Sequence, residues 1–312
     1  LSLQPSEFSK VAVVIFMAGY LVRQQQEVRN NLTGFLKSLV VLGTFIVLFL
    51  LEPDFGAVVV MMGAVLGMFF LGGMRKRHIS IVLMATAGLG AITVYAADYR
   101  VKRLVSYLDP WADPFGSGYQ LTQAQIAFGR GGWFGEGLGQ SMQKLFYLPE
   151  AHTDFVYSVL AEEWGAFGAL VVVALYGVLI VRGLHVGQRA ERLGRLFSAY
   201  LAYGLVLLIA AQAMINIGVN LGLLPTKGLT LPFVSYGGSS MLACAASLGI
   251  LLRISLENDV TYGASYAEHR VHVQTPHGPL DTPTKEVTPG LDDIDQWFTD
   301  DAKQQDWHNE KV

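Results

Sequence analysis

Residues 155–181 have the sequence FVYSVLAEEWGAFGALVVVALYGVLIV, an apolar run of the kind that crosses a membrane. A helix needs about 20 apolar residues to cross a hydrocarbon layer roughly 30 Å thick. Short charged loops separate most of the chain's apolar stretches, which favours membrane spans over the buried helices of a soluble protein. The sequence therefore predicts an all-α polytopic membrane protein with seven transmembrane helices in this chain. Besides 155–181, the expected spans are residues 5–22, 35–51, 56–72, 79–97, 196–217 and 237–254.

Composition supports a lipid environment and divides the chain in two. Only 15% of the residues are charged and 52% are hydrophobic, whereas a soluble domain carries about 25% charged residues. Residues 1–254 contain 18 Lys and Arg against 13 Asp and Glu, a net charge of +5, while residues 255–312 contain 4 against 12, a net charge of −8. The second part also lacks long apolar periodicity and carries several prolines. We therefore expect a membrane body over 1–254 and a disordered acidic tail over 255–312.

The short loops predict the orientation of the spans, because cytoplasmic loops are enriched in Lys and Arg. Loop 52–55 has no base and loop 218–236 has only Lys227, so we place these loops outside. The chain then starts outside and ends in the cytoplasm. It opens at Leu1 without a recognisable signal peptide, so we expect an odd number of spans upstream. The loops expected inside carry Arg23, Arg29, Lys37, Arg75, Lys76, Arg77, Arg182, Arg189, Arg192 and Arg195.

The segment 98–154 is expected to form a large extracytoplasmic loop. It is too polar to span the membrane, and too long to be a passive connection in a compact fold. Residues 119–128 have helical periodicity and are expected to form a helix along the membrane surface. The flanking sequence is rich in proline and glycine. We expect the functional site in this loop.

Ionisable side chains at membrane depth are costly and usually face a cavity or one another. Glu7 and Lys10 stand three residues apart on the first span and can pair on one face, either as a self-contained ion pair or as part of a substrate-binding surface. Glu52 and Asp54 could bind a cation or cap the next helix, and capping is favoured. Two further carboxylates, Glu162 and Glu163, are expected to pack against polar groups of another helix.

Three bases, Arg100, Lys102 and Arg103, form a cluster beside a span on the side otherwise poor in bases. Such a cluster suits a phosphate group in the outer headgroup layer. Contact with ordinary anionic lipid is the alternative interpretation. Lys227, the single base of its loop, has the same two interpretations.

The segment PEAHTDF at 149–155 places three ionisable groups where the long loop meets the span that follows. A carboxylate in a partly desolvated position has a raised pKa and can serve as a general base. Alternatively, Thr153 or Asp154 could cap the following helix. His152 and Asp154 alone are too few ligands to predict a metal site.

The motifs of common soluble enzymes are missing from the sequence. It contains no GxxxxGK[ST], HExxH or GxSxG pattern, and these patterns mark phosphate-binding loops, zinc proteases and serine hydrolases. Without a nucleotide-binding loop, the energy for any reaction must come from the substrate or from an ion gradient.

Six separate runs, in the same order, resemble the SEDS family of shape, elongation, division and sporulation proteins (FtsW/RodA/SpoVE). Within the family, PEAHTDF and PTKGLTLP resemble the division branch more than the elongation branch. The resemblance covers essentially the whole membrane body. The runs are QPSEFSK (4–10), EPDFG (52–56), DPFGSGYQLTQ (113–123), GRGGWFGEGLG (129–139), LPEAHTDF (148–155) and LPTKGLTLPFVSYGGSS (224–240).

This resemblance implies ten spans in an intact member, so three would precede residue 1. It also implies a peptidoglycan glycosyltransferase that polymerises lipid II at the outer face of the inner membrane during cell division. The family's catalytic aspartate falls on Asp154, and the leaving group is undecaprenyl pyrophosphate. The expected partners are a class B penicillin-binding transpeptidase, other divisome proteins and membrane lipid, with no nucleic acid.

The remaining assignments rest on charge and position. We expect Glu7, Lys10, Glu150 and His152 to contact the substrate, and a divalent cation, Mg²⁺ or Mn²⁺, could assist. The substrate-binding bases would be Arg100, Lys102, Arg103 and Lys227.

Two other function classes stay open from the sequence. A flippase or transporter for the lipid-linked precursor would use buried ionisable groups such as Glu7, Lys10, Glu162 and Glu163. A division scaffold would act through the acidic tail. The long outer loop with an acid at its base favours the outer-face enzyme.

Overall fold

A computed structural model describes residues 4–31, 33–52, 54–95, 101, 107–226 and 228–273. The chain forms two compact units, Leu1–Ala264 and Ser265–Val312. Of the second unit, only the end of one helix, up to Val273, belongs to the described residues. The proposed disordered tail therefore lies mostly outside them.

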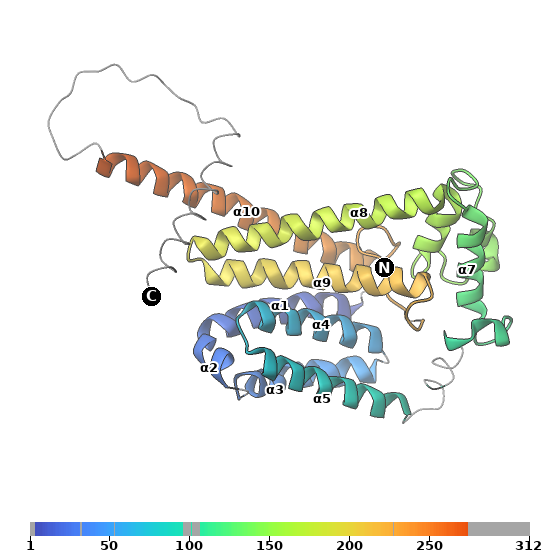
Figure 1. Cartoon of the computed structure of the whole chain (residues 1–312), viewed down its shortest axis with the longest axis horizontal. Coiled ribbons are helices and arrows are strands. Elements are labelled where there is room, and N and C mark those ends of the chain that lie inside the picture. Colours follow the sequence, from blue (N-terminus) through green and yellow to red (C-terminus); the bar gives the residue numbers. More distant parts are fainter. Residues whose placement is uncertain are drawn as a thin grey trace, which may run out of the picture. The chain divides into compact units, whose positions relative to one another are not determined.

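Every regular element in the described part of the chain is helical (Figure 1), as predicted. A short 3-10 turn, Pro110–Ala112, and a π-helical turn η2, Gln143–Tyr147, lie in the long loop. The helices are α1 (Pro5–Arg23), α2 (Gln25–Asn30), α3 (Thr33–Leu51), α4 (Phe55–Leu71), α5 (Lys76–Tyr95), α7 (Tyr119–Gly131), α8 (Val156–Arg192), α9 (Leu196–Asn220) and α10 (Gly238–Val273).

Among the described residues, five helices are long and apolar enough to cross a membrane: α1, α3, α8, α9 and the first 25 residues of α10. The helix α4 is apolar but has only 17 residues, and α5 is helical but is not among the five. All seven expected stretches are therefore helical, and five meet the criteria for a span. The last helix continues past its expected end at residue 254, partly because Arg195 bonds both Glu257 and Asn258.

The centre of the first unit is α9, which packs against α1, α4 and α8. In its most apolar window 72% of the residues are buried, against 22% in α8. A helix that is apolar and covered on all sides belongs in a core, while an apolar exposed helix suits lipid. Polar side chains on α9 therefore lie in the core of the first unit, where each needs a hydrogen-bond partner.

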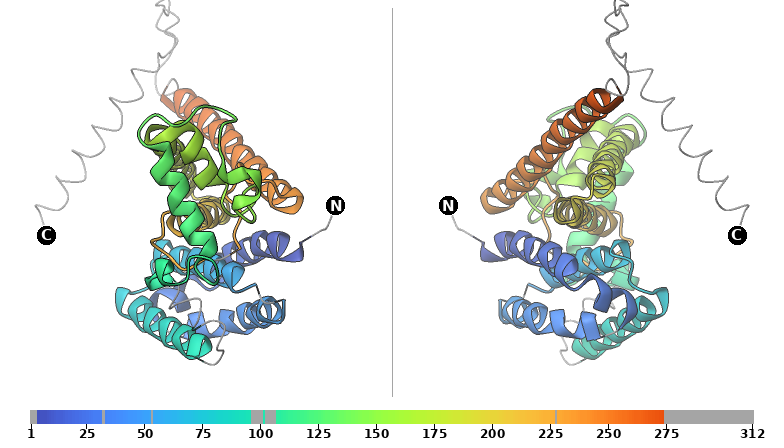
Figure 2. Two further views of the ribbon diagram at one scale, coloured as in Figure 1. Left: turned by 90° about the vertical axis from the view of Figure 1, so that its right-hand side faces the viewer. Right: turned by 90° about the vertical axis from the view of Figure 1, so that its left-hand side faces the viewer.

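The helix expected at 119–128 is confirmed as α7. In Figure 1 it runs across the ends of α8 and α9, and the left view of Figure 2 faces it directly. Its contacts are with α8, η2 and the Pro110–Ala112 turn, with a few to α9. The helix ends at Gly132, whose φ of +49° is a left-handed conformation that favours glycine. The chain then turns back toward α8.

A break in α8 joins it to this loop. Gly165 has φ +71° and ψ −173° inside the helix, a conformation open only to glycine. The backbone groups freed by the break are paired with the loop: Ala166 N donates to Gly132 O at 2.8 Å, and Glu136 N donates to Glu162 O at 3.0 Å. Unpaired backbone groups at membrane depth are costly, so the loop completes the helix.

Candidate active site

The segment 148–155 forms a tight turn before α8. The backbone N–H groups of Thr153, Asp154 and Phe155 all donate to the carbonyl of Glu150 at 3.1 to 3.2 Å. Glu150 has a positive φ of +55°, which is uncommon for a residue with a side chain. The aromatic ring of Phe155 is buried with neighbours from α7 and α9. The turn is thus fixed to the protein body, and Asp154 lies on it.

Two asparagines of α9 hold the backbone of Asp154. Asn216 and Asn220 each donate a side-chain N–H to the Asp154 carbonyl oxygen at 2.9 Å. Both asparagines are buried. The Oδ1 atom of Asn220 also accepts from the backbone N–H and the hydroxyl of Ser158, at 3.1 and 2.7 Å. The turn and the first residues of α8 are therefore fixed by a helix far away in the sequence.

The expectation that Thr153 or Asp154 could cap α8 is wrong. The N-cap residue is Phe155, and no side chain of its own segment caps the helix. The hydroxyl of Thr153 donates instead to Glu150. Asn220 supplies the acceptor to Ser158 N that a local cap would provide. The carboxylate of Asp154 is therefore free of the capping role.

The Asp154 carboxyl lies in an environment that disfavours its charge. Burial, followed by the carboxylates of Glu150 and then Asp54, raises its pKa to about 6. In the part of the chain that the structure describes, no hydrogen-bond donor is recorded for this carboxyl group. A group whose pKa lies near neutral pH can both accept and hold a proton there. This arrangement suits a general base.

The segment 228–236 forms a wall of the site. The backbone of Gly228 faces Asp154 so closely that a side-chain Cβ there would lie 3.3 Å from the Asp154 Oδ2 atom. Tyr236 N donates to His152 O at 2.9 Å, and the Ser235 hydroxyl donates to Thr153 O at 2.5 Å. The wall is therefore hydrogen-bonded to the turn at two positions.

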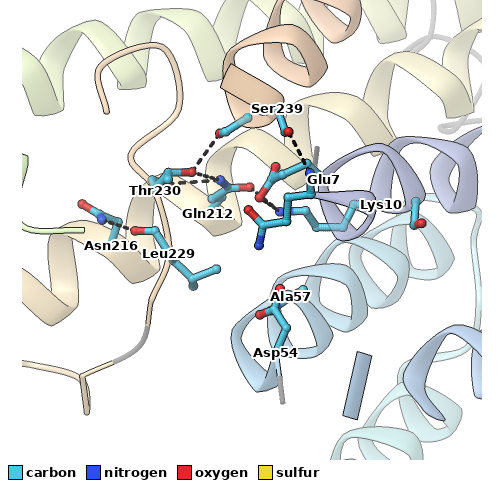
Figure 3. A network of polar contacts seen from close by, with 12 residues as sticks. Glu7, Lys10, Asp54, Ala57, Gln212, Asn216, Leu229, Thr230 and Ser239 are labelled. Atoms are coloured by element: carbon cyan, nitrogen blue, oxygen red, sulfur yellow. Dashed lines mark hydrogen bonds and ion pairs between the residues drawn. The ribbon is translucent and has the colours of Figure 1, made fainter. Parts of the chain in front are cut away.

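The pair Glu7 and Lys10 lies in a buried polar network behind this wall (Figure 3). Lys10 Nζ donates to Glu7 Oε1 and to Gln212 Oε1, both at 2.9 Å, and the Lys10 residue is 1% exposed. Gln212 in turn donates to the backbone and hydroxyl oxygens of Thr230 at 3.1 Å. This geometry supports the self-contained pair. A substrate-binding role for Glu7 and Lys10 stays a prediction.

Asp54 was expected to cap a helix, and this is confirmed. Its Oδ1 atom accepts from Ala57 N at 2.9 Å at the start of α4, as Figure 3 shows. The same carboxylate lies close enough to Asp154 to raise the pKa of Asp154. The start of α4 therefore lies near enough to the Asp154 turn to influence its charge.

The carboxylate of Glu162 is fully buried and has several partners. It accepts from the Ser141 hydroxyl at 2.5 Å, from Met142 N and Gln143 N at 3.2 Å, and pairs with Arg130 at 3.3 Å. These partners belong to α7 and the long loop. Glu162 therefore uses the loop as well as a neighbouring helix.

The adjacent Glu163 also bonds the long loop. Its Oε1 atom pairs with Lys144 Nζ at 2.6 Å. Lys144 belongs to the π-helical turn η2, so both glutamates bond polar groups of other helical elements, as expected, and these elements lie in the long loop.

The structure thus unites three of the predicted site residues, Glu150, His152 and Asp154, on one turn, with Glu150 and His152 exposed. Their contact with substrate stays a prediction. Among the described residues, no group of three or more His, Cys, Asp or Glu side chains is arranged to hold a metal ion. The predicted bases Arg100, Lys102, Arg103 and Lys227 lie outside the described residues.

Sequence reasoning missed Gln212, Asn216 and Asn220. A signal was available, because three amides recur every four residues in an otherwise apolar span, and polar side chains within a span usually bond to neighbouring segments. It also assigned no role to Gly228, although this residue lies within the run LPTKGLTLPFVSYGGSS (224–240) that carries the family resemblance.

Comparison with known proteins shows the family of the chain. The model of the FTSW_RODA_SPOVE family, described as "Cell cycle protein", matches residues 1–260. A probable peptidoglycan glycosyltransferase FtsW of Pseudomonas fluorescens is 56% identical over 267 residues, which cover 86% of this chain and 66% of the relative. The FtsW of Hahella chejuensis is also 56% identical, over 82% of this chain and 65% of the relative. The chain spans about two thirds of the length of these relatives.

Two solved structures are similar in fold. A chain from work on the coordination of polymerization and crosslinking by a peptidoglycan synthase complex has a TM-score of 0.65 at 30% identity, covering 83% of this chain and 71% of that one. The rod shape determining protein RodA of Thermus thermophilus has a TM-score of 0.53 at 28% identity, covering 83% of this chain and 67% of that one.

Proposed function

The chain belongs to the FtsW/RodA/SpoVE family of cell cycle proteins, and on that premise we propose that it polymerises lipid II into glycan strands during cell division. Its similarity to proteins named peptidoglycan glycosyltransferase supports this proposal. The single observation that carries it is the Asp154 carboxyl, which is partly buried and has a pKa raised to about 6.

The proposed reaction uses Asp154 as the general base. Asp154 removes the proton from the 4-hydroxyl of the acceptor sugar, and the hydroxyl oxygen attacks the anomeric carbon of the donor. The bond from that carbon to the pyrophosphate oxygen breaks with inversion, and undecaprenyl pyrophosphate leaves with the bonding electrons. At pH 7 a base with a pKa near 6 is mostly ionised and ready to accept a proton. The turn, α9 and segment 228–236 hold this base in place.

Negative charge on the departing pyrophosphate needs stabilisation, which is usually a large catalytic contribution. We assign that task to Arg100, Lys102, Arg103 and Lys227, aided by a divalent cation such as Mg²⁺ or Mn²⁺. The position of Lys227 in the chain supports its part of the assignment, because it directly precedes Gly228, whose backbone faces the Asp154 carboxylate.

The proposed location is the inner membrane at the division septum, with Asp154 at the outer face. The distribution of bases supports the orientation. The Asp154 end of the first unit contains the end of α9 and the starts of α4, α8 and α10. Bases concentrate instead beyond the opposite helix ends, as expected of a cytoplasmic side. We propose a class B penicillin-binding transpeptidase as partner, which the similarity to a peptidoglycan synthase complex supports.

The test uses the purified full-length protein with its transpeptidase partner and labelled lipid II. Glycan polymer should form, and Asp154→Asn should abolish it while leaving the folded protein intact. Lipid II translocation across vesicles that survives this substitution, with no polymer in either protein, would support a flippase instead. A division scaffold would show neither activity, and deletion of the acidic tail would abolish its recruitment.

A second test fixes the side of the membrane. A cysteine introduced at position 154, in a Cys244→Ala background, should react with a membrane-impermeant maleimide added from outside. The single native cysteine is buried, so its removal serves as a background control. Reaction only from the cytoplasmic side would overturn the outer-face enzyme.

A further inference from the structure

The buried side-chain amides of Asn216 and Asn220 on α9 bond three parts of the site: the Asp154 turn, segment 228–236 and the start of α8. Asn216 and Asn220 stand one helical turn apart, and the Asn220 side-chain N–H also donates to Asn216 O at 2.9 Å. Asn216 donates both to Asp154 O, at 2.9 Å, and to Leu229 O, at 2.5 Å. One side chain therefore bonds the turn that carries the acid and the segment that faces it.

Asn220 links the same turn to the start of α8. Its Nδ2 atom donates to Asp154 O and its Oδ1 atom accepts from Ser158 at the start of α8. The carbonyl of Asp154 thus accepts two hydrogen bonds from α9. Since α9 is the most buried of the five span-length helices, these bonds have little freedom to shift.

We propose that Asn216 and Asn220 are positioning residues that set the place of the Asp154 carboxylate relative to segment 228–231. This inference rests on the proposed role of Asp154 as general base. Catalysis by a base depends on its distance to the proton that it removes, and a misplacement of about 1 Å can reduce turnover about a hundredfold. Once the backbone carbonyl of Asp154 is held in place, its side chain has only the χ1 and χ2 torsions left to vary.

A purely structural role is the alternative, and the two roles differ in what they change. Loss of structure lowers the fraction of folded protein, while loss of position lowers the turnover of each folded molecule. Ser158→Ala is the matched control, because it removes the hydroxyl bond to Asn220 at 2.7 Å and leaves both bonds to Asp154.

The experiment measures kcat and KM for lipid II with the full-length protein and its partner. The folded fraction is measured by size-exclusion chromatography and thermal unfolding. For Asn220→Ala and Asn216→Ala we expect kcat per folded molecule to fall about 10- to 100-fold, with KM within about twofold of the unchanged protein. Ser158→Ala should stay within about threefold in kcat. Wild-type kcat per folded molecule in both asparagine variants would overturn the proposal, and so would failure of both to fold.

A parallel Asp154→Asn variant separates this inference from the proposed function. If Asp154→Asn keeps full turnover, the base assignment itself fails, and the positioning role fails with it. If Asp154→Asn is inactive while the folded asparagine variants are fully active, only the positioning role is wrong. A cryo-electron microscopy structure of Asn220→Ala should show the carboxylate displaced from Gly228.

Discussion

Asp154 and Glu162 are two acids at the same end of α8, and their surroundings are opposite. Glu162 is fully buried, accepts three hydrogen bonds and pairs with Arg130. Asp154 is partly buried, lies near Glu150 and Asp54, and has no recorded donor to its carboxyl group within the described residues. A carboxylate held by several partners stabilises a fold, whereas one whose charge is disfavoured by burial and by neighbouring carboxylates can be available for chemistry. The comparison predicts that the two residues respond oppositely to substitution.

The largest expected effect is on turnover at Asp154. Asp154→Asn should lower kcat by about 10² to 10⁴, the usual contribution of a general base. The measurement is polymer formed per folded molecule from labelled lipid II. Glu162→Gln should leave turnover per folded molecule within about tenfold. Similar losses in both variants would remove the distinction between the two acids.

The next effect concerns stability at Glu162. Glu162→Gln should lower the free energy of unfolding by about 1 to 3 kcal/mol, because the amide keeps only one acceptor oxygen for the buried donors and no longer carries the charge that pairs with Arg130. Thermal unfolding in detergent measures the change. Lys37→Ala is a suitable control, since its pair with Glu27 is exposed and should contribute less than about 1 kcal/mol. An unchanged Glu162→Gln would show that its network is dispensable.

Asp154→Asn should change the free energy of unfolding in the opposite direction to Glu162→Gln and stabilise the protein at neutral pH. The pKa of Asp154 is raised in the folded state from 3.8 to about 6. The contribution of the protonated form is therefore fully present below the unfolded pKa of 3.8, and it is lost as the pH rises from there to the folded pKa of about 6. Since one pKa unit corresponds to about 1.4 kcal/mol, the gain at pH 7.5 is at most about 3 kcal/mol. Well below the unfolded pKa of 3.8, at about pH 2.5, the carboxyl is protonated in both states and the difference should vanish. A loss of stability at pH 7.5 would contradict the comparison.

The same pKa predicts the dependence of rate on pH. Only the ionised acid accepts a proton, so kcat/KM, which reports the pKa of the substrate-free enzyme, should fall as the pH drops through about 6 and be about tenfold lower at pH 5 than on the plateau. Initial rates from pH 4.5 to 8 give the midpoint. Glu162→Gln should retain that midpoint. A profile that is flat between pH 5 and 7 would exclude Asp154 as the titrating group.

The smallest effect is expected at Gly228. A Cβ at this position would lie 3.3 Å from Asp154 Oδ2, so Gly228→Ala should shift the carboxylate by a few tenths of an ångström and lower kcat about three- to tenfold. Gly237→Ala, directly after this segment, is the matched control, because the nearest neighbours of its Cβ would lie at 3.5 Å. Equal rates for both variants would show that the wall does not restrain the acid.

Sequence reasoning predicted the helices, including the one at 119–128, because each depends on a local pattern. The assignment of Asp154 as the catalytic acid came from a recognisable motif and stays a prediction. Sequence reasoning misassigned the cap of α8, because the acceptor comes from Asn220 on another helix. It did not identify Lys144 as the partner of Glu163, because the folded long loop brings the two side chains together. Contacts between distant segments depend on the tertiary arrangement, which periodicity within one segment does not contain.

The break of α8 at Gly165 has a consequence for biosynthesis. Residues 132–136 pair with the broken part of α8 and leave the ribosome before residues 162–166 do. The loop segment that pairs with the break is therefore already present when residues 162–166 are made. The Asp154 turn has the opposite order, since Asn220 follows it by 66 residues. The nascent chain can therefore complete the loop early, but the reactive acid acquires its final place only after α9 has been made. A chain that stalls before that point carries no finished site.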